Sequence, residues 1–118
     1  MTLGLNQTST VLLVTRGGMG DAPEELQHKL ATTYFRLLAE NDMLPGAICF
    51  YTEGVKLVCA GSPVLDWLRA LAEKGVHLIV CSTCLEFYGL KEQVEVGIVG
   101  GMTDIIETQW RADKVIAI

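Results

Sequence analysis

VHLIVCSTCLEFYGL, residues 76–90, runs an apolar segment into two cysteines, two aromatic residues and a glycine. VHLIV (76–80) has the length and apolar character of a buried strand, and CLEFYG can form a helical turn after it. Cys81 and Cys84 therefore lie where a strand ends and a helix begins. Two thiols at such a place can form a metal site, a disulfide or a reactive pair, or they can be two small core residues.

Four more short segments have the same apolar pattern bounded by turn residues. They are VLLVT (11–15), AICFY (47–51), a strand near residues 96–99, and KVIAI (114–118). Because the runs are continuously apolar, both faces of the resulting sheet are expected to be covered.

A long helical pattern follows the first predicted strand. Asp21 and Glu24 have capping-box spacing and predict a helix over about 22–40. Its expected apolar face consists of residues four apart, namely Leu26, Leu30, Tyr34 and Leu38.

Two further helices are expected later in the chain. Ser62 and Pro63 predict the start of one, and Gly75 stands where a left-handed C-terminal cap is common. The apolar face of this helix is expected at Leu65, Leu68, Leu71 and Ala72. The other helix is predicted over about 102–110.

This alternation predicts a three-layer, flavodoxin-like α/β sandwich with a mainly parallel five-stranded sheet and right-handed crossovers. In such sheets ligands bind outside the carboxyl ends of the strands, where the strand order reverses. The loops expected to matter are TRGGMGD (15–21), YTEGVK (51–56), CSTCLEFYG (81–89) and VGGMTD (99–104).

Length and composition fit one well-packed domain over residues 1–118, with 1–10 as a flexible start. The net charge of −5, without a basic cluster, makes nucleic acid an unfavourable partner. No apolar run approaches the roughly 20 residues of a membrane span, and no secretory signal starts the chain. We therefore expect a cytoplasmic protein with no membrane partner and with reduced thiols.

The thiol pair is the candidate catalytic site. The free amides of a following helical turn are expected to favour thiolate over thiol at Cys81 and Cys84, which would make a nucleophile. Two thiols this close can also exchange a sulfur atom or close on each other. Cys49 lies inside an apolar strand and is expected to pack there, whereas the role of Cys59 stays open.

Other chemistry has weaker support in the sequence. A structural zinc site needs four ligands, and one cysteine pair supplies two, with His28 and His77 placed elsewhere, so no metal and no cofactor is predicted. A thioredoxin-like reductase remains an alternative, although no proline follows Pro63 to face the thiols. A flavodoxin-like binding module, with a flavin phosphate in the first glycine loop, is another.

Substrate contacts are predicted in the same crevice. Arg16, Gly17 and Gly18 belong to a loop that can present backbone amides to an anion, although the loop matches no phosphate-binding fingerprint and turning the chain is the simpler interpretation. Aromatic and sulfur side chains would form an apolar lip or a subunit contact there, or simply the rim of the core, namely Tyr51, Phe87, Tyr88 and Met102.

GVKLVCAGSPVLDWLRALAEKGVHLIVCSTCLEFYGL (54–90), followed by VGIVGGMTDIIETQWRADKVIAI (96–118), resembles the DsrE/DsrF-like family. The similarity is closest to the carboxyl-terminal domain of YedF-type proteins, which are described as sulfurtransferase-like and linked to selenium metabolism. The resemblance implies a flavodoxin-like fold, homo-oligomers, and a cysteine after the third strand that accepts sulfur as a persulfide.

By position, Cys81 matches the family's acceptor cysteine, and Cys84 belongs to a C-x-T-C form that looks typical of YedF-like members. The resemblance thus implies a sulfurtransferase or relay carrier for sulfane sulfur or selenium, with Cys84 as the resolving thiol. YedF-like proteins carry a TusA-like domain before this one, so a TusA-like sulfur carrier is expected to act in trans. The alternative is a non-enzymatic, oligomeric ligand-binding or structural module with unreactive cysteines.

Overall fold

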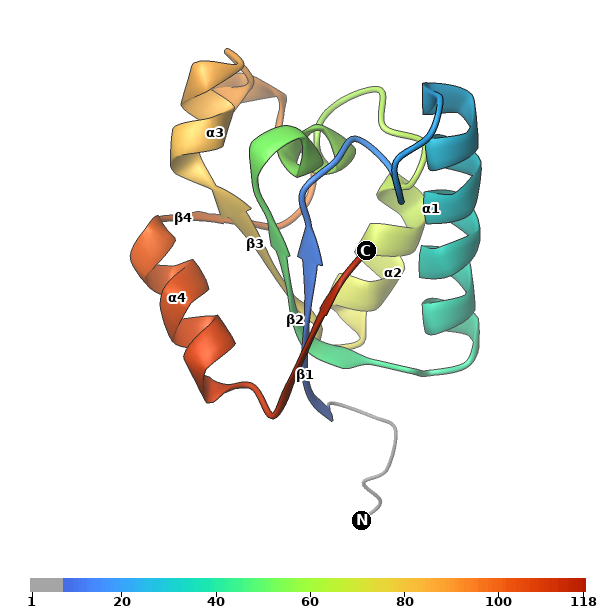
Figure 1. Cartoon of the computed structure of the whole chain (residues 1–118), viewed down its shortest axis with the longest axis vertical. Helices are drawn as coiled ribbons and strands as arrows, with labels where there is room; N and C mark the ends of the chain where they lie inside the picture. Colours follow the sequence, from blue (N-terminus) through green and yellow to red (C-terminus); the bar gives the residue numbers. More distant parts are fainter. Residues whose placement is uncertain (1–7) are drawn as a thin grey trace.

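Five parallel strands form a single sheet in the computed structural model, which describes residues 8–118 (Figure 1). The strands are β1 (Thr8–Val14), β2 (Pro45–Phe50), β3 (His77–Cys81), β4 (Ile98–Gly100) and β5 (Lys114–Ala117). The helices are α1 (Glu24–Glu40), η1 (Thr52–Val58), α2 (Leu65–Glu73), α3 (Ser82–Phe87), η2 (Lys91–Gln93) and α4 (Met102–Arg111), where η marks a 3-10 helix. The predicted α/β sandwich with a five-stranded sheet is confirmed, and every pairing is parallel.

The strand order is β4-β3-β2-β1-β5. Helices α1 and α2 pack against each other on one face of the sheet, and α4 lies on the other face (Figure 1). The connections after β1 and β2 therefore cross one face, whereas the connection after β4 crosses the opposite one. This change of side makes the carboxyl ends of β3 and β4 the expected position for a ligand site.

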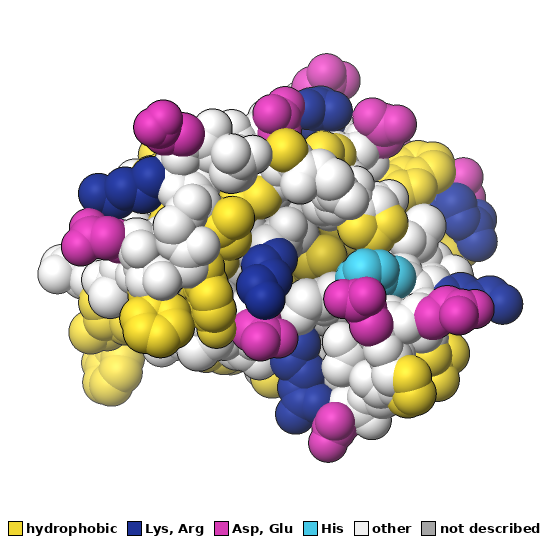
Figure 2. Space-filling view, turned by 90° about the horizontal axis from the view of Figure 1, so that it is seen from above, with side chains coloured by type: hydrophobic (Ala, Val, Ile, Leu, Met, Phe, Trp, Pro, Cys, Tyr) yellow, Lys and Arg dark blue, Asp and Glu magenta, His cyan; other side chains and the backbone are white. Residues whose placement is uncertain are grey.

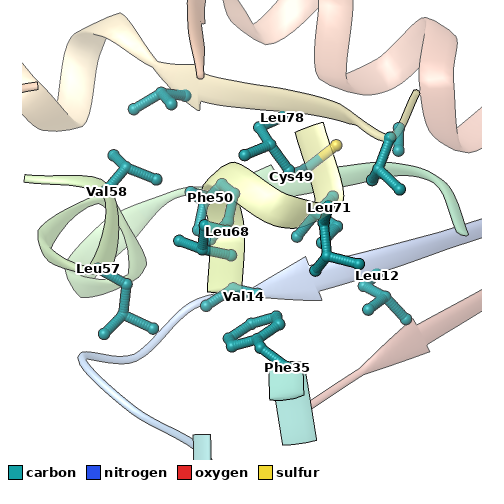
Figure 3. Packing of buried hydrophobic residues seen from close by; sticks show 14 of the residues in the cluster. Leu12, Val14, Phe35, Cys49, Phe50, Leu57, Val58, Leu68, Leu71 and Leu78 are labelled. Carbon is teal, nitrogen blue, oxygen red and sulfur yellow. The ribbon is translucent and has the colours of Figure 1, made fainter. Parts of the chain in front are cut away.

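The core lies mainly between the sheet and the α1–α2 layer. Side chains from α1, α2 and η1 point toward those of β1 and β2 (Figure 3). The largest fully buried members include Phe35, Ile48, Phe50, Leu57, Leu68 and Leu71. Burial of large apolar side chains on this scale is the main term that stabilises the fold.

The start of α1 differs from the sequence prediction. The helix begins at Glu24 with Pro23 at its N-cap, and no side chain caps it. The predicted capping box is wrong, because the Asp21 carboxylate instead forms an ion pair with Arg16 at 3.3 Å. Proline at the N-cap costs little, since the first N–H groups of a helix have no partner within it.

The buried face of α1 was predicted only in part. Tyr34 and Leu38 are partly buried and pack against the core, but Leu26 and Leu30 are exposed, and the fully buried residues are Ala31, Phe35 and Ala39. A row of residues four apart drifts by about 40° per step around a helix with 3.6 residues per turn. Two alanines on the true inner face let α1 lie close to the sheet.

The end of α2 confirms the prediction at Gly75. Its φ of 99° places it in the left-handed region, where glycine has no side chain to clash. The Val76 N–H donates to the Leu71 carbonyl at 3.1 Å, and the Gly75 N–H donates to that of Ala72 at 3.0 Å. These two bonds form a Schellman motif, which ends the helix and turns the chain into β3.

The beginning of the chain was expected to be flexible over residues 1–10. Residues 1–7 lie outside the described part of the chain. Residues 8–10 belong to β1 and pair with β2 and β5, so the expectation is wrong there. Across residues 8–118, no helix has the length and apolar character needed to cross a lipid bilayer.

A substitution at Gly54 tests whether close packing of η1 against β1 stabilises the fold. An added Cβ would lie 1.9 Å from the Val14 carbonyl oxygen, so Gly54→Ala must push η1 away from β1. We expect a loss of about 2 kcal/mol or more in the free energy of unfolding, measured by urea denaturation. The matched control is Gly17→Ala, where a Cβ meets nothing within 4 Å. Equal midpoints for the two variants would contradict this account.

Candidate functional site

Cys81 and Cys84 lie at the junction of β3 and α3. Cys81 is the last residue of β3 and is in register with Gly100 of β4, while Cys84 lies in the first turn of α3. The sequence prediction placed both thiols at the carboxyl edge of the sheet, and the structure brings them together there. The strand extends through Cys81, however, so this residue belongs to the sheet and not to the loop after it.

The two thiols differ in their access to solvent. Cys81 is 1% exposed and is part of the core, because strands and helices enclose it on the sheet. In the single chain, Cys81 is therefore closed off from solvent. Cys84 is partly exposed and is the thiol of the pair that solvent reaches.

The sulfur of Cys84 is held by two neighbours. The main-chain N–H of Thr52 donates to its Sγ at 3.1 Å, and a side-chain hydrogen bond links it to Cys81. Thr52 is the first residue of η1, so the loop after β2 reaches the thiol that follows β3. The carboxyl ends of neighbouring strands thus supply both thiols and a hydrogen-bond donor.

The environment of Cys84 does not favour its thiolate. Burial raises the pKa of the Cys84 thiol, and the hydrogen bond with Cys81 raises it further, while the Thr52 N–H lowers it. The predicted lowering by helix amides is wrong for this residue. Its position inside the six-residue α3, with its own sulfur partly desolvated, makes burial the largest effect.

The other two cysteines are structural. Cys49 is fully buried in β2, and burial raises its pKa to about 11, as expected for a packing residue. Cys59, whose role the sequence left open, is also buried, and its Sγ donates to the Val55 carbonyl at 3.2 Å. Burial, and then the Glu95 carboxylate, raise the pKa of Cys59. Neither thiol presents a nucleophile to solvent.

A cleft of about 570 Å³ opens at the same end of the sheet (Figure 2). Its walls come from the loop after β1, the start of α1, η1 with the turn after it, and the end of α3. Acidic, basic and uncharged polar side chains line it, among them Glu24, His28, Glu53, Lys56 and Tyr88. The Lys56 ammonium lies 4.8 Å from the centre of the Tyr88 ring, which fixes it beside the cleft.

The predicted substrate contacts are divided between several places. Gly17 and Tyr88 line the cleft. Arg16, Gly18, Tyr51 and Met102 do not line it. Gly18 packs against the backbone of Gln27, where a Cβ would lie 2.6 Å from the Gln27 carbonyl carbon.

Tyr51 and Met102 are close in sequence to residues that meet the two cysteines, namely Thr52 and Gly100. Tyr51 follows β2, is partly buried, and has its pKa raised by burial and then by Cys49. Met102 begins α4 directly after the β4 strand that pairs with β3, and it is 50% exposed. Neither Cys81 nor Cys84 lines the cleft.

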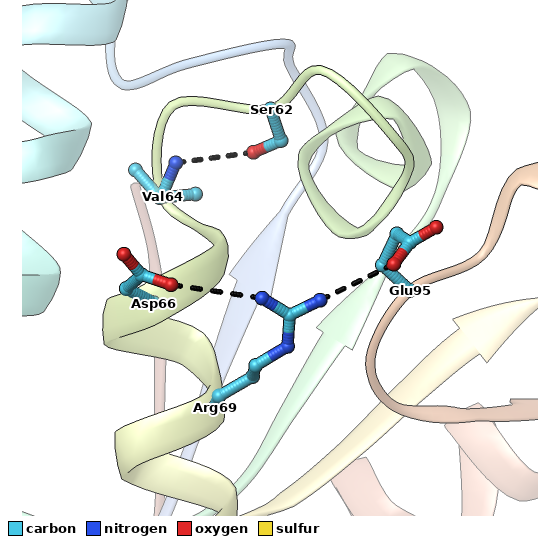
Figure 4. Close-up of polar contacts among 5 residues, drawn as sticks. All are labelled: Ser62, Val64, Asp66, Arg69 and Glu95. Carbon is cyan, nitrogen blue, oxygen red and sulfur yellow. Dashed lines mark hydrogen bonds and ion pairs between the residues drawn. The ribbon is translucent and has the colours of Figure 1, made fainter.

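The segment directly after η2 contacts both α2 and η1. Arg69 on α2 forms ion pairs with Asp66 at 3.6 Å and Glu95 at 3.2 Å (Figure 4). The Glu95 N–H donates to the Val58 carbonyl at 2.8 Å, and Cys59 forms an antiparallel bridge with Val94. These contacts hold the connection between β3 and β4 against η1.

Sequence reasoning missed the contribution of η1, because TEGVKLVCAG has neither strand alternation nor helical spacing. Thr52 and Lys56 lie in the expected loop YTEGVK (51–56) but were not singled out as site residues, and Gly54 was the one local signal of a close backbone approach. Within the described part of the chain, no three His, Cys, Asp or Glu side chains gather where they could hold a metal ion.

The fold and the site place the chain in one class of protein: an open parallel α/β sheet with a pair of thiols at the carboxyl edge of the sheet. The sequence matches the DsrE/DsrF-like family over residues 11–118, and the chain belongs to that family. No curated protein sequence matches the chain.

Several solved structures share the fold. The YchN protein of Escherichia coli superimposes with a TM-score of 0.68 at 16% identity, covering 94% of this chain and 99% of that one. BT1422 of Bacteroides thetaiotaomicron, a conserved protein of unknown function, gives 0.67 at 17% identity over 92% and 93% of the two chains. MTH1491 of Methanobacterium thermoautotrophicum, also of unknown function, gives 0.66 at 19% identity over 92% and 97%.

The thiols should differ in their alkylation. With iodoacetamide and peptide mapping of the native protein, Cys84 should react first, and Cys49 and Cys59 should react only after unfolding. Because its pKa is raised, Cys84 carries less thiolate at pH 7 than an ordinary cysteine, so its rate should keep rising well into the alkaline range. A plateau near neutral pH would contradict this.

Proposed function

We propose that the protein accepts and transfers sulfane sulfur at the Cys81–Cys84 pair. The observation that carries the proposal is the partly exposed Cys84 sulfur, held beside Cys81 and under a main-chain N–H. Membership of the DsrE/DsrF-like family, which is associated with sulfur relay, supports it. Because Cys81 is buried, we assign the first contact with the donor to Cys84 and the second step to Cys81.

The proposed chemistry needs a persulfide donor, R–S–SH. The Cys84 thiolate attacks the outer sulfur, the bond between the two donor sulfurs breaks, and R–S⁻ leaves and takes a proton from water. Cys84 then carries a persulfide. If Cys81 attacks its outer sulfur, the persulfide moves to Cys81, and Cys84 regains its thiol.

A second outcome is open to the same pair. If Cys81 attacks the inner sulfur of the persulfide, a Cys81–Cys84 disulfide forms and hydrosulfide, HS⁻, is released. A dithiol reductant must then restore the two thiols. All four cysteines are free thiols in the structure, and we propose the cytoplasm as the compartment that keeps them so.

The donor is proposed to be a carrier protein rather than a free small thiol. A TusA-like sulfur carrier acting in trans would bring its persulfide to the partly exposed Cys84. Selenium can replace the transferred sulfur, since a selenosulfide bond undergoes the same exchange. The YedF-type, selenium-linked role is the finer form of this proposal.

Intact-mass measurement after exposure to a persulfide donor tests the function. Wild-type protein should gain the mass of one sulfur atom, or lose two hydrogens where the pair has closed to a disulfide. Cys84→Ala should do neither, and Cys81→Ala should load but fail to form the internal disulfide. Cys49→Ala is the matched control and should behave like wild type, because its thiol is fully buried. Loading on Cys81 without Cys84 would reverse the order of the two steps, and a wild type that neither gains sulfur nor forms the disulfide would remove the function.

A non-enzymatic ligand-binding module is the second candidate. The observation that favours it is the polar cleft of about 570 Å³, which does not include either thiol of the pair. Its volume is within the ordinary range for small-molecule sites. This function would gain support from the absence of sulfur loading in the mass experiment.

Self-association is proposed as well. Apolar side chains are exposed along the edge strand β4 and along α4, which we call the β4–α4 patch. Its members are Ile98, Val99, Met102, Ile106 and Trp110, with Trp110 84% exposed and Ile98 69% exposed. Exposed apolar side chains beside an open sheet edge are suited to contact with a second copy of this chain.

Sedimentation analysis tests the β4–α4 patch. Wild-type protein should sediment as more than one chain, and Trp110→Glu should shift it toward the monomer, because a carboxylate would be buried in the interface. Leu30→Glu is the control, since Leu30 is an exposed leucine on α1, on the opposite face of the sheet. A monomeric wild type, or equal effects of the two variants, would contradict the proposal.

A further inference from the structure

Thr52 has an unusual backbone conformation. Its φ is 47°, and among the described residues Thr52 and Asp42 are the non-glycine residues with positive φ. Aspartate tolerates the left-handed region, but a β-branched side chain crowds its own backbone there. Such strain persists only where neighbouring contacts enforce it.

Three contacts enforce this conformation. The Thr52 hydroxyl donates to the Thr15 carbonyl at 2.5 Å, which ties the turn to the end of β1. The Tyr51 N–H donates to the Val14 carbonyl at 3.1 Å, so the residue before Thr52 continues the sheet. Gly54 then lies against Val14, and its N–H donates to the Tyr51 carbonyl at 2.9 Å.

This turn sets the direction in which the main-chain N–H of Thr52 points. Thr52 is the first residue of η1, and the first N–H groups of a helix have no partner within the helix. Here that group donates to the Cys84 sulfur at 3.1 Å, across 32 positions of sequence. A hydrogen-bond donor fixed on a sulfur atom stabilises negative charge on it.

We propose that Thr52 is a positioning residue for the thiol pair. Its hydroxyl holds a strained turn whose main-chain N–H stabilises the negative charge on the Cys84 sulfur when that sulfur attacks a donor and when it leaves again. The use of this charge in sulfur transfer rests on the proposed function. The stabilisation itself is a property of the thiol and can be measured without any sulfur donor.

Charged groups around α3 do not replace this donor. On β3 the titratable neighbour is Cys81, which raises the pKa of Cys84. On η1, Glu53 and Lys56 form an ion pair with each other at 3.7 Å.

On η2, Lys91 pairs with Glu86 of α3 itself at 3.1 Å, and Glu92 is exposed. The Thr52 N–H is the contact that lowers the pKa of Cys84. Removing the hydroxyl that holds this N–H in place should therefore raise the pKa of Cys84 and lower its fraction of thiolate.

The test is the pH profile of Cys84 alkylation by iodoacetamide, followed by peptide mapping, in Thr52→Ala and Thr52→Ser. Thr52→Ala keeps the N–H but removes the hydroxyl that aims it, so the midpoint should move to higher pH. The rate at pH 7 should fall roughly three- to tenfold. Thr52→Ser keeps the hydroxyl and should stay within about twofold of wild type.

Thr32→Ala is the matched control, because the Thr32 hydroxyl also donates to a carbonyl, that of His28 at 2.8 Å, far from the thiols. It should leave the Cys84 profile unchanged. If Thr52→Ala proves unfolded by circular dichroism, Thr52→Val removes the same hydroxyl at nearly the same side-chain volume and carries the same expectation. Thr52→Gly adopts a positive φ without strain, so it should keep the turn and stay near wild type.

An unchanged Cys84 profile in the folded alanine or valine variant overturns the proposal. So does an equal shift in Thr32→Ala. Because no sulfur donor is present, these outcomes are independent of the mass experiment: failure of sulfur loading removes the proposed function and leaves the effect of Thr52 on the thiol standing.

Discussion

The backbone of Gly54 lies directly against the carbonyl of Val14, and this contact leaves no space for a side chain. It fixes η1 on the end of β1, so that the chain leaving β2 turns over the sheet edge instead of away from it. The Tyr51–Thr52 turn, the cleft wall at Lys56 and the N–H on Cys84 all follow from that placement. The site therefore depends on a backbone-to-backbone approach more than on any charged group.

The thiol pair combines a buried and a partly exposed sulfur within one hydrogen-bonded unit. Burying an uncharged thiol costs little, whereas burying a thiolate costs much, and this difference explains why desolvation dominates at Cys84. One main-chain donor opposes that effect. In the proposed relay this balance keeps Cys84 mostly as a thiol at rest, while the Thr52 N–H stabilises the charge on its sulfur at the moment of transfer.

Local patterns were sufficient for much of the fold. Continuously apolar runs identified all five strands, and Gly75 marked the end of α2, because its left-handed cap is a property of a few adjacent residues. At α1 the patterns predicted the extent of the helix and its packing at Tyr34 and Leu38, but they missed the Asp21–Arg16 ion pair and the fully buried face through Phe35. Both errors concern which residue a side chain contacts in the folded chain. A local sequence pattern does not specify such contacts.

The sequence by itself determined the order of strands and helices, the parallel sheet that this order requires, and the presence of two thiols at the carboxyl end of β3. Only the tertiary structure decided that Cys81 is sealed in the core, that Cys84 meets solvent, and that Thr52 donates to it. The physical reason is the range of the interactions. Strand and helix preferences act between near neighbours in sequence, whereas burial and a hydrogen bond spanning 32 positions exist only after the sheet has brought β2 and β3 side by side.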